Sequence, residues 1–435
     1  MTLYLSAQTY IWCVTSDISN ILYNKHLNPA ILLCDKTMFS IGEIMKDVYL
    51  VEGLRTPLGG FQGSLSSVEA TDLAAQAIQD LIRRTNIPVN AINEVIMGNV
   101  LSAGFGQAPA RQAMIKAGIG NNCHALTINK VCGSGMKAIH MAADAIKLGN
   151  ADLIIAGGME NMSNTAYTLP KARAGYRMGN AQVVDLMVHD GLTDPYSGNH
   201  MGVLAEKTAE KNNITRQDQD DWATRSYNLS QKAVSDGKFK DEITSITITT
   251  RKGETIVDSD EEPFRGDVTK LAGLRSAFIK DGTITAGNAS TISDGAAVIL
   301  LASQEAVDKY NLKPIAKLKA GTSSSIAPDD FSEGPVYAMQ KILEQANLKA
   351  TDIDLYEINE AFAVVPIVAQ RKLNIDMDKI NVNGGAISLG HPIGASGARI
   401  VVTLMHEMKK QQAKYGLASL CIGGGEGIAS ILELV

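Results

Sequence analysis

The feature that most constrains the fold is an order of elements that occurs twice along the chain. Two glycine-flanked segments, around Cys132 and around His391, are each followed by a helical pattern, an apolar strand, a glycine turn and a closing apolar strand. The helical patterns, strands and closing strands lie at 136–147, 152–156 and 296–302 in the first series, and at 394–412, 417–422 and 428–434 in the second. This repeat predicts two similar α/β halves, each with a mixed sheet between helices, related by a pseudo-twofold axis.

The first series is longer than the second because a segment at roughly 162–292 separates its glycine turn from its closing strand. This segment is richer in charge and in polar loop character, which predicts a separate loop domain over the active site. The predicted divisions are an N-terminal extension at 1–45, a first half at 46–161 and 293–313, a loop domain at 162–292, and a second half at 314–435.

Cys132 ends a short apolar stretch just before a helical pattern, with Gly133 and Gly135 after it. A thiol at a helix N-terminus faces unpaired backbone N–H groups and the positive end of the helix dipole, which favour the thiolate. Glycines beside it let a substrate approach the backbone closely. A small buried cysteine next to a tight turn is the structural alternative.

His391 lies in the glycine-rich run 383–399 and is followed by Pro392, which favours an extended backbone before the next helix. A histidine on such a loop can hold a thiolate as an ion pair, take its proton, or donate to a carbonyl oxygen. Structural and phosphate-facing roles are the alternatives.

Two further polar groups follow predicted strands. Cys421 ends an apolar strand just before a turn of three glycines, at the edge where open α/β sheets place their ligands. Asn359 follows the apolar-acidic run 353–358, and its amide can fix a water or donate to an oxyanion. A buried strand cysteine and a helix cap are the structural alternatives. Together with Cys132 and His391, these residues form a constellation suited to acyl transfer.

Four motifs resemble those of the thiolases, in the same order: NKVCGSG at 129–135, NEAFA at 359–363, GHP at 390–392 and CIGGG at 421–425. The resemblance is to the biosynthetic branch and covers about 46–435, opening with VYLVEGLRTP at 48–57. It implies a thiolase-like α/β fold: two similar halves with mixed five-stranded sheets in an αβαβα layering, plus an inserted loop domain.

The resemblance also implies a chemistry for each motif. Cys132 would attack the thioester of acetyl-CoA after activation by His391, and Cys421 would remove a proton from the methyl carbon of a second acetyl-CoA. His391 and a water held by Asn359 would stabilise the resulting enolate. The backbone N–H groups of Cys132 and Gly423 would form a second oxyanion hole. The product would be acetoacetyl-CoA, in a reversible reaction.

Contacts with CoA and the acyl group follow from weaker parts of the resemblance. The segment 191–202 resembles the lining of a pantetheine tunnel, and 285–290 resembles a segment that contacts pantetheine and adenine. The implied substrate-binding residues are Leu192, His200, Met201, Arg265, Phe278, Ala286, Ser290 and Phe362. Lys270 stands where the family has a small serine, so contacts with the phosphates or the adenine are expected to differ. Arg265 could equally be a solvated arginine.

Composition limits the other functions that the chain can have. A net charge of −6 and the lack of a lysine- or arginine-rich run with interleaved aromatics argue against a nucleic-acid partner. No apolar stretch reaches the ~20 residues of a membrane span, so no membrane partner is expected. Five cysteines, an odd number, favour a reducing, cytoplasmic location over a disulfide framework. Neither a CxxC nor an HExxH pattern indicates a metal, and no cofactor beyond CoA and acetyl-CoA as substrates is expected.

Residues 1–45 fit neither a signal peptide nor a transit peptide, because they lack early positive charge, a long apolar core and arginine. The hypothesis is that this segment is an upstream extension, and that translation starts at Met38 or Met45. From the resemblance alone, we expect a homotetramer, a dimer of dimers connected through residues near 171–185.

Three alternatives keep a similar fold. A degradative 3-ketoacyl-CoA thiolase would cleave longer chains, although GASG at 394–397 and Met201 favour a short acyl group. A non-catalytic scaffold or lipid-binding relative would have lost part of the constellation, whereas every member is present here. Ketoacyl synthases use one cysteine, and Cys421 in its glycine turn distinguishes this chain from them.

Overall fold

A computed structural model describes residues 31–34, 37–40, 46–251 and 253–435. The chain divides into two compact units, Met1–Lys46 and Asp47–Val435. In the first unit, strands β1 (Ile31–Cys34) and β2 (Thr37–Ser40) form an antiparallel hairpin. The hypothesis on residues 1–45 falls mostly outside the described residues. The predicted domain boundaries stay predictions.

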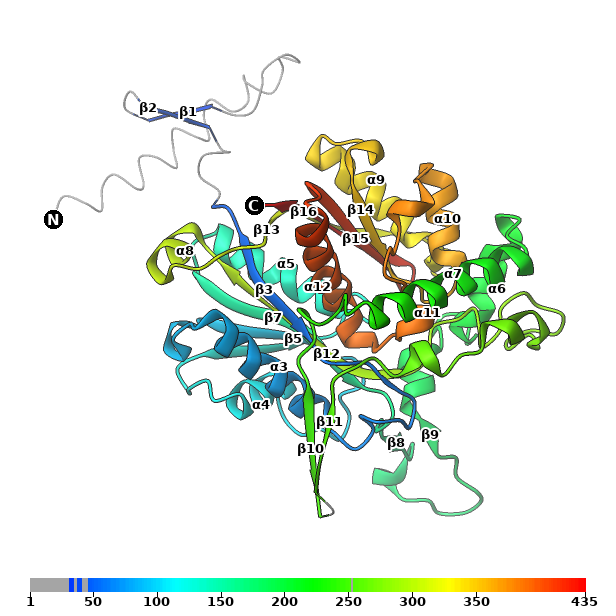
Figure 1. Cartoon of the computed structure of the whole chain (residues 1–435). Coiled ribbons are helices and arrows are strands. Elements are labelled where there is room, and N and C mark those ends of the chain that lie inside the picture. Colours follow the sequence, from blue (N-terminus) through cyan, green and yellow to red (C-terminus); the bar gives the residue numbers. More distant parts are fainter. Residues whose placement is uncertain (1–30, 35–36, 41–45, 252) are drawn as a thin grey trace, which may run out of the picture. The chain divides into compact units, whose positions relative to one another are not determined.

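A mixed sheet of ten strands runs through the second unit (Figure 1). Its order is β14 (Leu355–Ile358), β15 (Tyr415–Ile422), β16 (Glu426–Leu434), β13 (Ala316–Ser325), β3 (Tyr49–Arg55), β12 (Ser293–Ala302), β7 (Leu153–Asn161), β5 (Glu94–Gly98) and β6 (His124–Ile128), with β4 (Gly59–Gly60) paired to β12. Strands β13 and β3 pair through only Ala316 with Leu50 and Lys317 with Tyr49. The sheet is therefore two halves joined over a short stretch.

The two halves of the sheet have the same strand order and the same pairing directions. In the first half, β12 is antiparallel to both β3 and β7, and β5 is parallel to β7 and β6. In the second half, β16 is antiparallel to both β13 and β15, and β14 is parallel to β15. The internal repeat predicted from the sequence is therefore present in the strand topology.

The second half has four strands where the resemblance implies five. Tyr356 forms a single parallel bridge with Ile380 at the place of a fifth strand. The chain then turns at Asn381, whose φ is 46°. Its side chain replaces further strand pairing, because Asn381 Oδ1 accepts from the N–H of Ile358 and Nδ2 donates to its carbonyl, both at 2.8 Å. One amide side chain thus completes this edge of the sheet.

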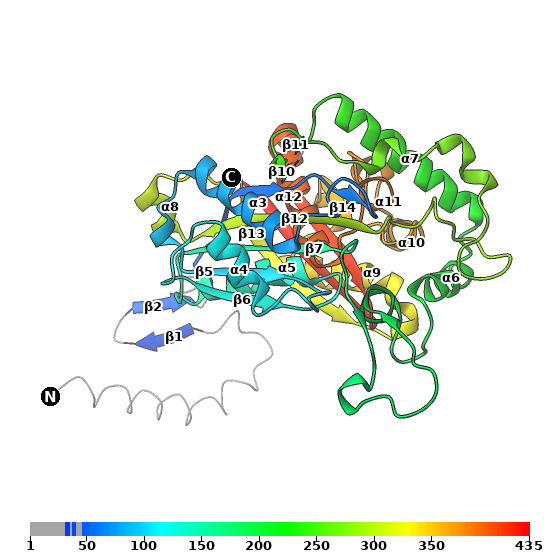
Figure 2. The same cartoon turned by 90° about the horizontal axis from the view of Figure 1, so that it is seen from below.

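Helices and the sheet form five layers, αβαβα. Alternate residues of β15 pack into two clusters on opposite faces: Leu417 and Cys421 in one, Ala418 and Leu420 in the other. The middle layer holds α5 (Ser134–Lys147) and α12 (Ile393–Gln411) between the two halves. The outer layers hold α3 (Ala70–Thr85) and α4 (Pro109–Lys116) on the first half, and α9 (Gly334–Ala346) and α10 (Val364–Leu373) on the second (Figures 1 and 2). This layering confirms the predicted fold class.

The two middle helices contact each other through backbone atoms. A Cβ on Gly135 of α5 would lie 2.7 Å from the backbone N of Ala398, and a Cβ on Gly397 of α12 would lie 2.5 Å from that of Met136. Both distances are too short for any side chain. The close contact holds the start of α5, after Cys132, against the start of α12, after His391.

The segment at 162–292 contains the remaining long helices. These are α6 (Met201–Lys211) and α7 (Arg216–Ser235), whose N-terminus carries a capping box in which Thr215 and Asp218 bond reciprocally. The other elements are the hairpins β8 (Tyr167–Thr168) with β9 (Val184–Asp185) and β10 (Ile246–Thr250) with β11 (Gly253–Val257), and a π-helical turn at Met187–Leu192.

Short helices complete the described chain. They are α8 (Gln304–Tyr310), α11 (Ala386–Leu389) and the 3₁₀ turns Val89–Ala91, Ala172–Ala174, Glu262–Phe264, Val268–Gly273, Pro328–Glu333, Ala350–Asp352 and Met377–Lys379. Within the described ranges, none of the helices combines the length and the apolar character that crossing a bilayer requires.

Candidate active site

Cys132 follows a strained turn. Val131 has a φ of 45°, which costs a β-branched residue about 1–3 kcal/mol. Side chains hold the turn: Asn129 Oδ1 accepts from the N–H of Val131 at 2.9 Å, and Ser134 Oγ accepts from the N–H of Lys130 at 2.8 Å. Ser134 Oγ also donates to the carbonyl of Val131 at 2.7 Å. The strain is therefore compensated locally, directly before the thiol.

The Cys132 thiol is half-buried among apolar side chains that include Met162, Met187 and Ile393. Burial raises the pKa of Cys132 to about 11, although the backbone N–H groups of Gly423 and of Cys132 itself act in the opposite direction. The expectation that the helix N-terminus makes this thiol unusually acidic is therefore wrong. Helix α5 begins only at Ser134, and loss of solvation outweighs its dipole.

His391 is buried in the loop between α11 and α12. Burial, and next the charge of Arg399, lower the pKa of His391 to about 3, so the imidazole is neutral at physiological pH. Its Nδ1 lies 2.6 Å from Ser396 Oγ and 3.4 Å from Asn359 Nδ2. With a protonated thiol and a neutral imidazole, the resting chain holds no thiolate–imidazolium pair. A neutral imidazole can still accept a proton as general base.

Asn359 lies directly after β14 and is buried. Its backbone N–H donates to the carbonyl of Ser419 at 3.0 Å, which fixes it against β15. Its Oδ1 lies 3.5 Å from Nη2 of the buried Arg399, whose Nη1 lies 3.5 Å from Glu357 Oε2. The amide is thus oriented with its oxygen towards Arg399 and its nitrogen towards His391.

Cys421 and Gly423 bring the second half of the chain to the Cys132 turn. Cys421 is fully buried near the end of β15, and burial raises its pKa well above the usual value, with the charge of Cys132 adding to the effect. A Cβ on Gly423 would lie 3.7 Å from both Val131 and Met201 side-chain atoms. The two cysteines, about 290 residues apart in the sequence, are therefore neighbours.

A cavity of about 640 Å³ opens beside His391 and contains most of the predicted substrate-binding residues. Of those eight residues, the seven that line it are Leu192, His200, Arg265, Phe278, Ala286, Ser290 and Phe362. Met201 does not line the cavity but lies buried beside Gly423. Cys132, Cys421 and Asn359 lie outside the lining, but Cys132 packs against the apolar cluster that contains Ile393, which is part of the lining.

Aromatic rings form one wall of this cavity. The rings of His200 and Phe278 stack with centroids 4.7 Å apart and planes 22° apart, and Phe278 meets Phe362 edge-on at 6.0 Å. Phe278 covers Gly202, where a Cβ would come within 2.4 Å of the ring. His200 Nδ1 caps α6 by accepting from the N–H of Gly202 at 3.1 Å. The start of α6 therefore positions both rings.

Arg265 lies at the cavity but already pairs with carboxylates. Its Nη1 lies 2.9 Å from Glu262 and 3.5 Å from Glu261. A phosphate would have to compete with both. Lys270, at the position where the resemblance implies a serine, is exposed and pairs with Asp267 at 3.0 Å.

Several residues near the site carried no recognisable sequence signal. Phe61, Met162, Tyr227, Thr291 and Ile292 also line the cavity, from separate segments. The signal that could have been noticed is a carboxylate in an apolar strand, since Glu160 lies near the end of β7, in which every residue is buried. It accepts hydrogen bonds close to Cys132 and His391.

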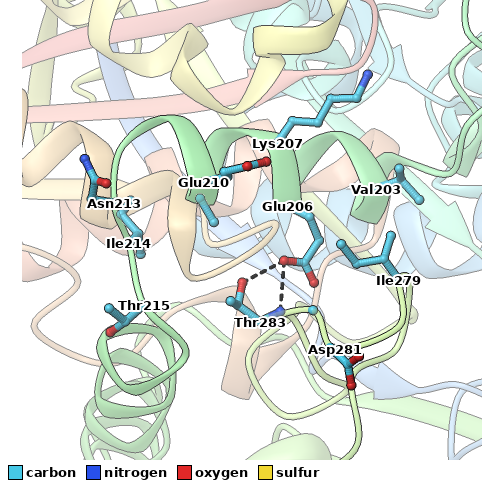
Figure 3. A pocket seen from close by; sticks show the side chains of 12 residues that line it. Val203, Glu206, Lys207, Glu210, Asn213, Ile214, Thr215, Ile279, Asp281 and Thr283 are labelled. Atoms are coloured by element: carbon cyan, nitrogen blue, oxygen red, sulfur yellow. Dashed lines mark hydrogen bonds between the residues drawn. The ribbon is translucent and has the colours of Figure 1, made fainter.

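A second cavity, of about 510 Å³, lies between α6 and the segment 279–283 (Figure 3). Its buried carboxylate, Glu206, points at Thr283 and accepts from that residue's N–H at 2.9 Å and hydroxyl at 2.7 Å (Figure 3). None of the predicted site residues lines it. No group of His, Cys, Asp and Glu among the described residues has the arrangement of a metal site.

Comparison with known proteins identifies this arrangement of motifs. Residues 48–305 match the family model described as thiolase, N-terminal domain, and residues 312–434 match thiolase, C-terminal domain. The chain belongs to the thiolase family. The two matched regions cover most of the chain and contain every predicted site residue.

Several acetyl-CoA acetyltransferases are similar to this chain over nearly their whole length. The acetyl-CoA acetyltransferase of Pseudomonas aeruginosa is 48% identical over 390 residues, which are 89% of this chain and 99% of that protein. An acetyl-CoA acetyltransferase of Escherichia coli is 48% identical over 391 residues, with the same coverage of both chains. The crystal structure of the Bacillus anthracis acetyl-CoA acetyltransferase has a TM-score of 0.88 at 39% identity, and the match covers 90% of this chain and 99% of that one.

Proposed function

We propose that this thiolase is an acetyl-CoA acetyltransferase that condenses two acetyl-CoA molecules reversibly to acetoacetyl-CoA and CoA. The observation that carries the proposal is that His391 lines a cavity formed by residues of the pantetheine-like segments. Cys132 packs against the apolar cluster that contains Ile393 of the same cavity, and Cys421 is a neighbour of Cys132. Relatives at 48% identity over almost their whole length bear this name.

The first half-reaction forms an acetyl-cysteine. The Cys132 sulfur attacks the thioester carbonyl as His391 removes its proton, so no free thiolate has to accumulate in the resting chain. The N–H groups that face the sulfur, those of Cys132 and Gly423, are positioned to stabilise the oxyanion of the tetrahedral intermediate. Collapse of that intermediate breaks the carbon–sulfur bond to CoA, and the Cys421 thiol gives its proton to the departing CoA sulfur, which leaves Cys421 as a thiolate and His391 as an imidazolium.

The second half-reaction forms the carbon–carbon bond. Cys421 removes a proton from the methyl carbon of a second acetyl-CoA, and the enolate carbon attacks the acetyl group on Cys132. The developing charge on the thioester oxygen is met by His391 and by a water held by Asn359. As the tetrahedral intermediate collapses, Cys132 leaves as its thiolate and takes its proton back from His391, while Cys421 keeps the proton of the methyl carbon. Acetoacetyl-CoA is freed and both thiols are restored.

Both cysteines have raised pKa values, which suits a cycle in which protons move only when substrate is bound. Burial keeps the Cys421 thiol neutral at rest, and bound acetyl-CoA would supply the acidic carbon and displace solvent. Burial also protects the Cys421 sulfur from oxidation. CoA and acetyl-CoA are the substrates of this proposal, without a further cofactor.

We further propose a homotetramer in the cytoplasm. The hairpin β8–β9 and its surroundings expose large apolar side chains, with Tyr167 64%, Met178 98% and Val183 63% exposed. Such a group of side chains fits a subunit contact. The free state of Cys123, Cys132 and Cys421 fits a reducing compartment. Light scattering at several concentrations tests the tetramer, and a dilution-independent monomer would contradict it.

The decisive assay is CoA-dependent cleavage of acetoacetyl-CoA, compared with 3-ketoacyl-CoA substrates of medium and long chain. We expect turnover to fall steeply as the chain lengthens, because apolar side chains fill the space around Cys132. Equal or faster cleavage of the long substrates would instead support a degradative thiolase. Absence of cleavage with every substrate would reject the enzymatic proposal.

A further inference from the structure

Glu160 is a buried carboxylate that the proposed mechanism does not use. It lies near the end of β7 with none of its surface exposed. Four donors surround it. Its Oε1 accepts from Asn99 Nδ2 at 2.7 Å and the N–H of Leu101 at 3.1 Å, and its Oε2 accepts from the N–H of Val100 at 3.0 Å and of Gly394 at 2.8 Å.

These donors come from both halves of the molecule. Asn99, Val100 and Leu101 follow β5 of the first half, and the latter two belong to the apolar cluster against which Cys132 packs. Gly394 is the second residue of α12 in the second half, three residues after His391. The carboxylate therefore joins the surroundings of the thiol to the start of the helix that follows the imidazole.

We propose that Glu160 is a positioning residue, which holds the start of α12, and with it His391, at the distance from Cys132 that acyl transfer requires. The inference deepens the proposed function and rests on it.

The four donors show that the carboxylate is ionised when the site is formed. Each oxygen accepts two hydrogen bonds, so a proton on either oxygen would face a donor. Burial acts in the opposite direction and raises the pKa of Glu160 to about 7, while the same four donors lower it. We favour the ionised form, because a fixed set of N–H donors and the N-terminus of the 19-residue helix α12 both stabilise negative charge.

The charge also acts on the thiol. After burial, and against the two N–H groups that lower it, the charge of Glu160 raises the pKa of Cys132. The other titratable groups around the thiol are His391 before α12, Cys421 on β15, and the ion pair of Lys130 with Glu426. Removal of the Glu160 charge should therefore lower the pKa of Cys132. A variant that only displaces the start of α12 and keeps the charge should leave the pKa of Cys132 unchanged.

The experiment replaces Glu160 in the full-length chain and follows two readouts. In Glu160→Gln, an amide of the same shape presents its NH₂ group to two N–H donors, so the two hydrogen bonds to that oxygen position are lost. We expect the rate of Cys132 acetylation by acetyl-CoA in a single turnover to fall by about 10²-fold, with little change in the acetyl-CoA concentration for half-maximal rate. The rate of Cys132 alkylation by iodoacetamide, followed by mass spectrometry, should rise with pH at a lower pH than in the wild type.

Two further variants separate charge from position. Glu160→Asp keeps the charge but withdraws it by one methylene, so acetylation should slow without a shift in the alkylation profile. Gly394→Ala places a Cβ 2.7 Å from Glu160 Oε2, which pushes the carboxylate and the start of α12 apart but keeps the charge. Acetylation should again slow without a shift in the alkylation profile. The matched control is Glu333→Gln, since Glu333 is a buried carboxylate that bonds Lys372 and Asn212 away from the cavity. Its acetylation rate should match that of the wild type.

The proposal fails if Glu160→Asp and Gly394→Ala acetylate Cys132 as fast as the wild type. It also fails if Glu160→Gln slows acetylation no more than Glu333→Gln does at equal thermal stability, or leaves the alkylation profile unmoved. If the wild type itself forms no acetyl-Cys132, the proposed function fails instead. Because alkylation needs no acetyl-CoA, its pH profile still reports on the Glu160 charge in that case.

Discussion

The two halves of this thiolase share one topology but place different groups at equivalent points. Before α5 the first half has a half-buried thiol on a strained turn, and before α12 the second half has a buried, neutral imidazole. At the end of β7 the first half has Glu160, while near the end of β15 the second half has Cys421. The repeat therefore supplies the positions, and the chemistry comes from the residues in which the halves differ.

The largest loss of activity is expected when the thiol before α5 is removed. In Cys132→Ser the proposed nucleophile is lost, and we expect turnover of acetoacetyl-CoA to fall by at least about 10⁴-fold. Intact-mass measurement after incubation with acetyl-CoA should find no acetyl-enzyme. An acetyl group on the serine variant would place the nucleophile elsewhere.

The equivalent change in the second half should affect a different step. Cys421→Ser removes the proposed base for carbon–carbon bond formation, so condensation should slow by about 10²–10⁴-fold. Acetylation of Cys132 should persist and be visible by mass. A Cys421→Ser protein that acquires no acetyl group would contradict the division of roles between the halves.

Arg399 tests the second half alone, because its buried charge pairs with Glu357 of the same half. Arg399→Met leaves Glu357 without its cationic partner and frees the amide oxygen of Asn359, which should cost about 3 kcal/mol of the free energy of unfolding. Urea denaturation measures the loss. The pair variant Glu357→Met with Arg399→Met should recover most of the stability, and a pair no more stable than the single variant would show that the charges are not coupled.

The last and smallest effect is a difference in how a histidine on each middle helix makes stability depend on pH. On α5, burial and then the charges of Lys137 and Lys147 lower the pKa of His140 to about 3. On α12, the pKa of His406 is raised despite burial, because Glu52, Glu242 and the carbonyl of Gly53 favour the charged form.

His140 is neutral in both states above its unfolded pKa of 6.5, so it contributes no pH dependence there. Between pH 6.5 and about 3 only the unfolded chain binds the proton. The free energy of unfolding therefore decreases by about 1.4 kcal/mol for each unit by which pH is lowered. His406 has the opposite sign, because its contribution is present below 6.5 and is lost as pH rises through the folded pKa. Denaturation of the wild type and of His140→Gln from pH 7 to 5 measures the difference, and a constant difference would contradict the buried neutral state of His140.

The repeat made most of the fold predictable from the sequence. Helix α12 begins at Ile393 where 394 was predicted, and β15 and β16 cover the predicted strands. What the pattern could not indicate was the missing fifth strand of the second half. Asn381 replaces strand pairing with its side-chain amide, and a hydrogen bond of that kind has no periodicity to detect.

The motifs predicted which residues form the candidate site, but they did not predict properties that depend on burial, such as the protonation of a thiol. The motifs led to Cys132, His391, Asn359 and Cys421, but the local sequence around Cys132 indicated a thiolate where loss of solvation gives a thiol. Solvation depends on the whole surroundings, which come from segments far apart in the chain. For the same reason, the four donors around Glu160 could not be assigned before the halves were placed together.

The glycine contact between α5 and α12 has a consequence for how this enzyme can vary. Gly135 and Gly397 do not line the cavity beside His391, yet each sets how closely one helix approaches the other, and the two helices begin just after Cys132 and His391. A methyl group at either glycine would therefore move sulfur and imidazole apart together. Under selection for activity, these two residues without side chains should tolerate replacement as poorly as the nucleophile itself.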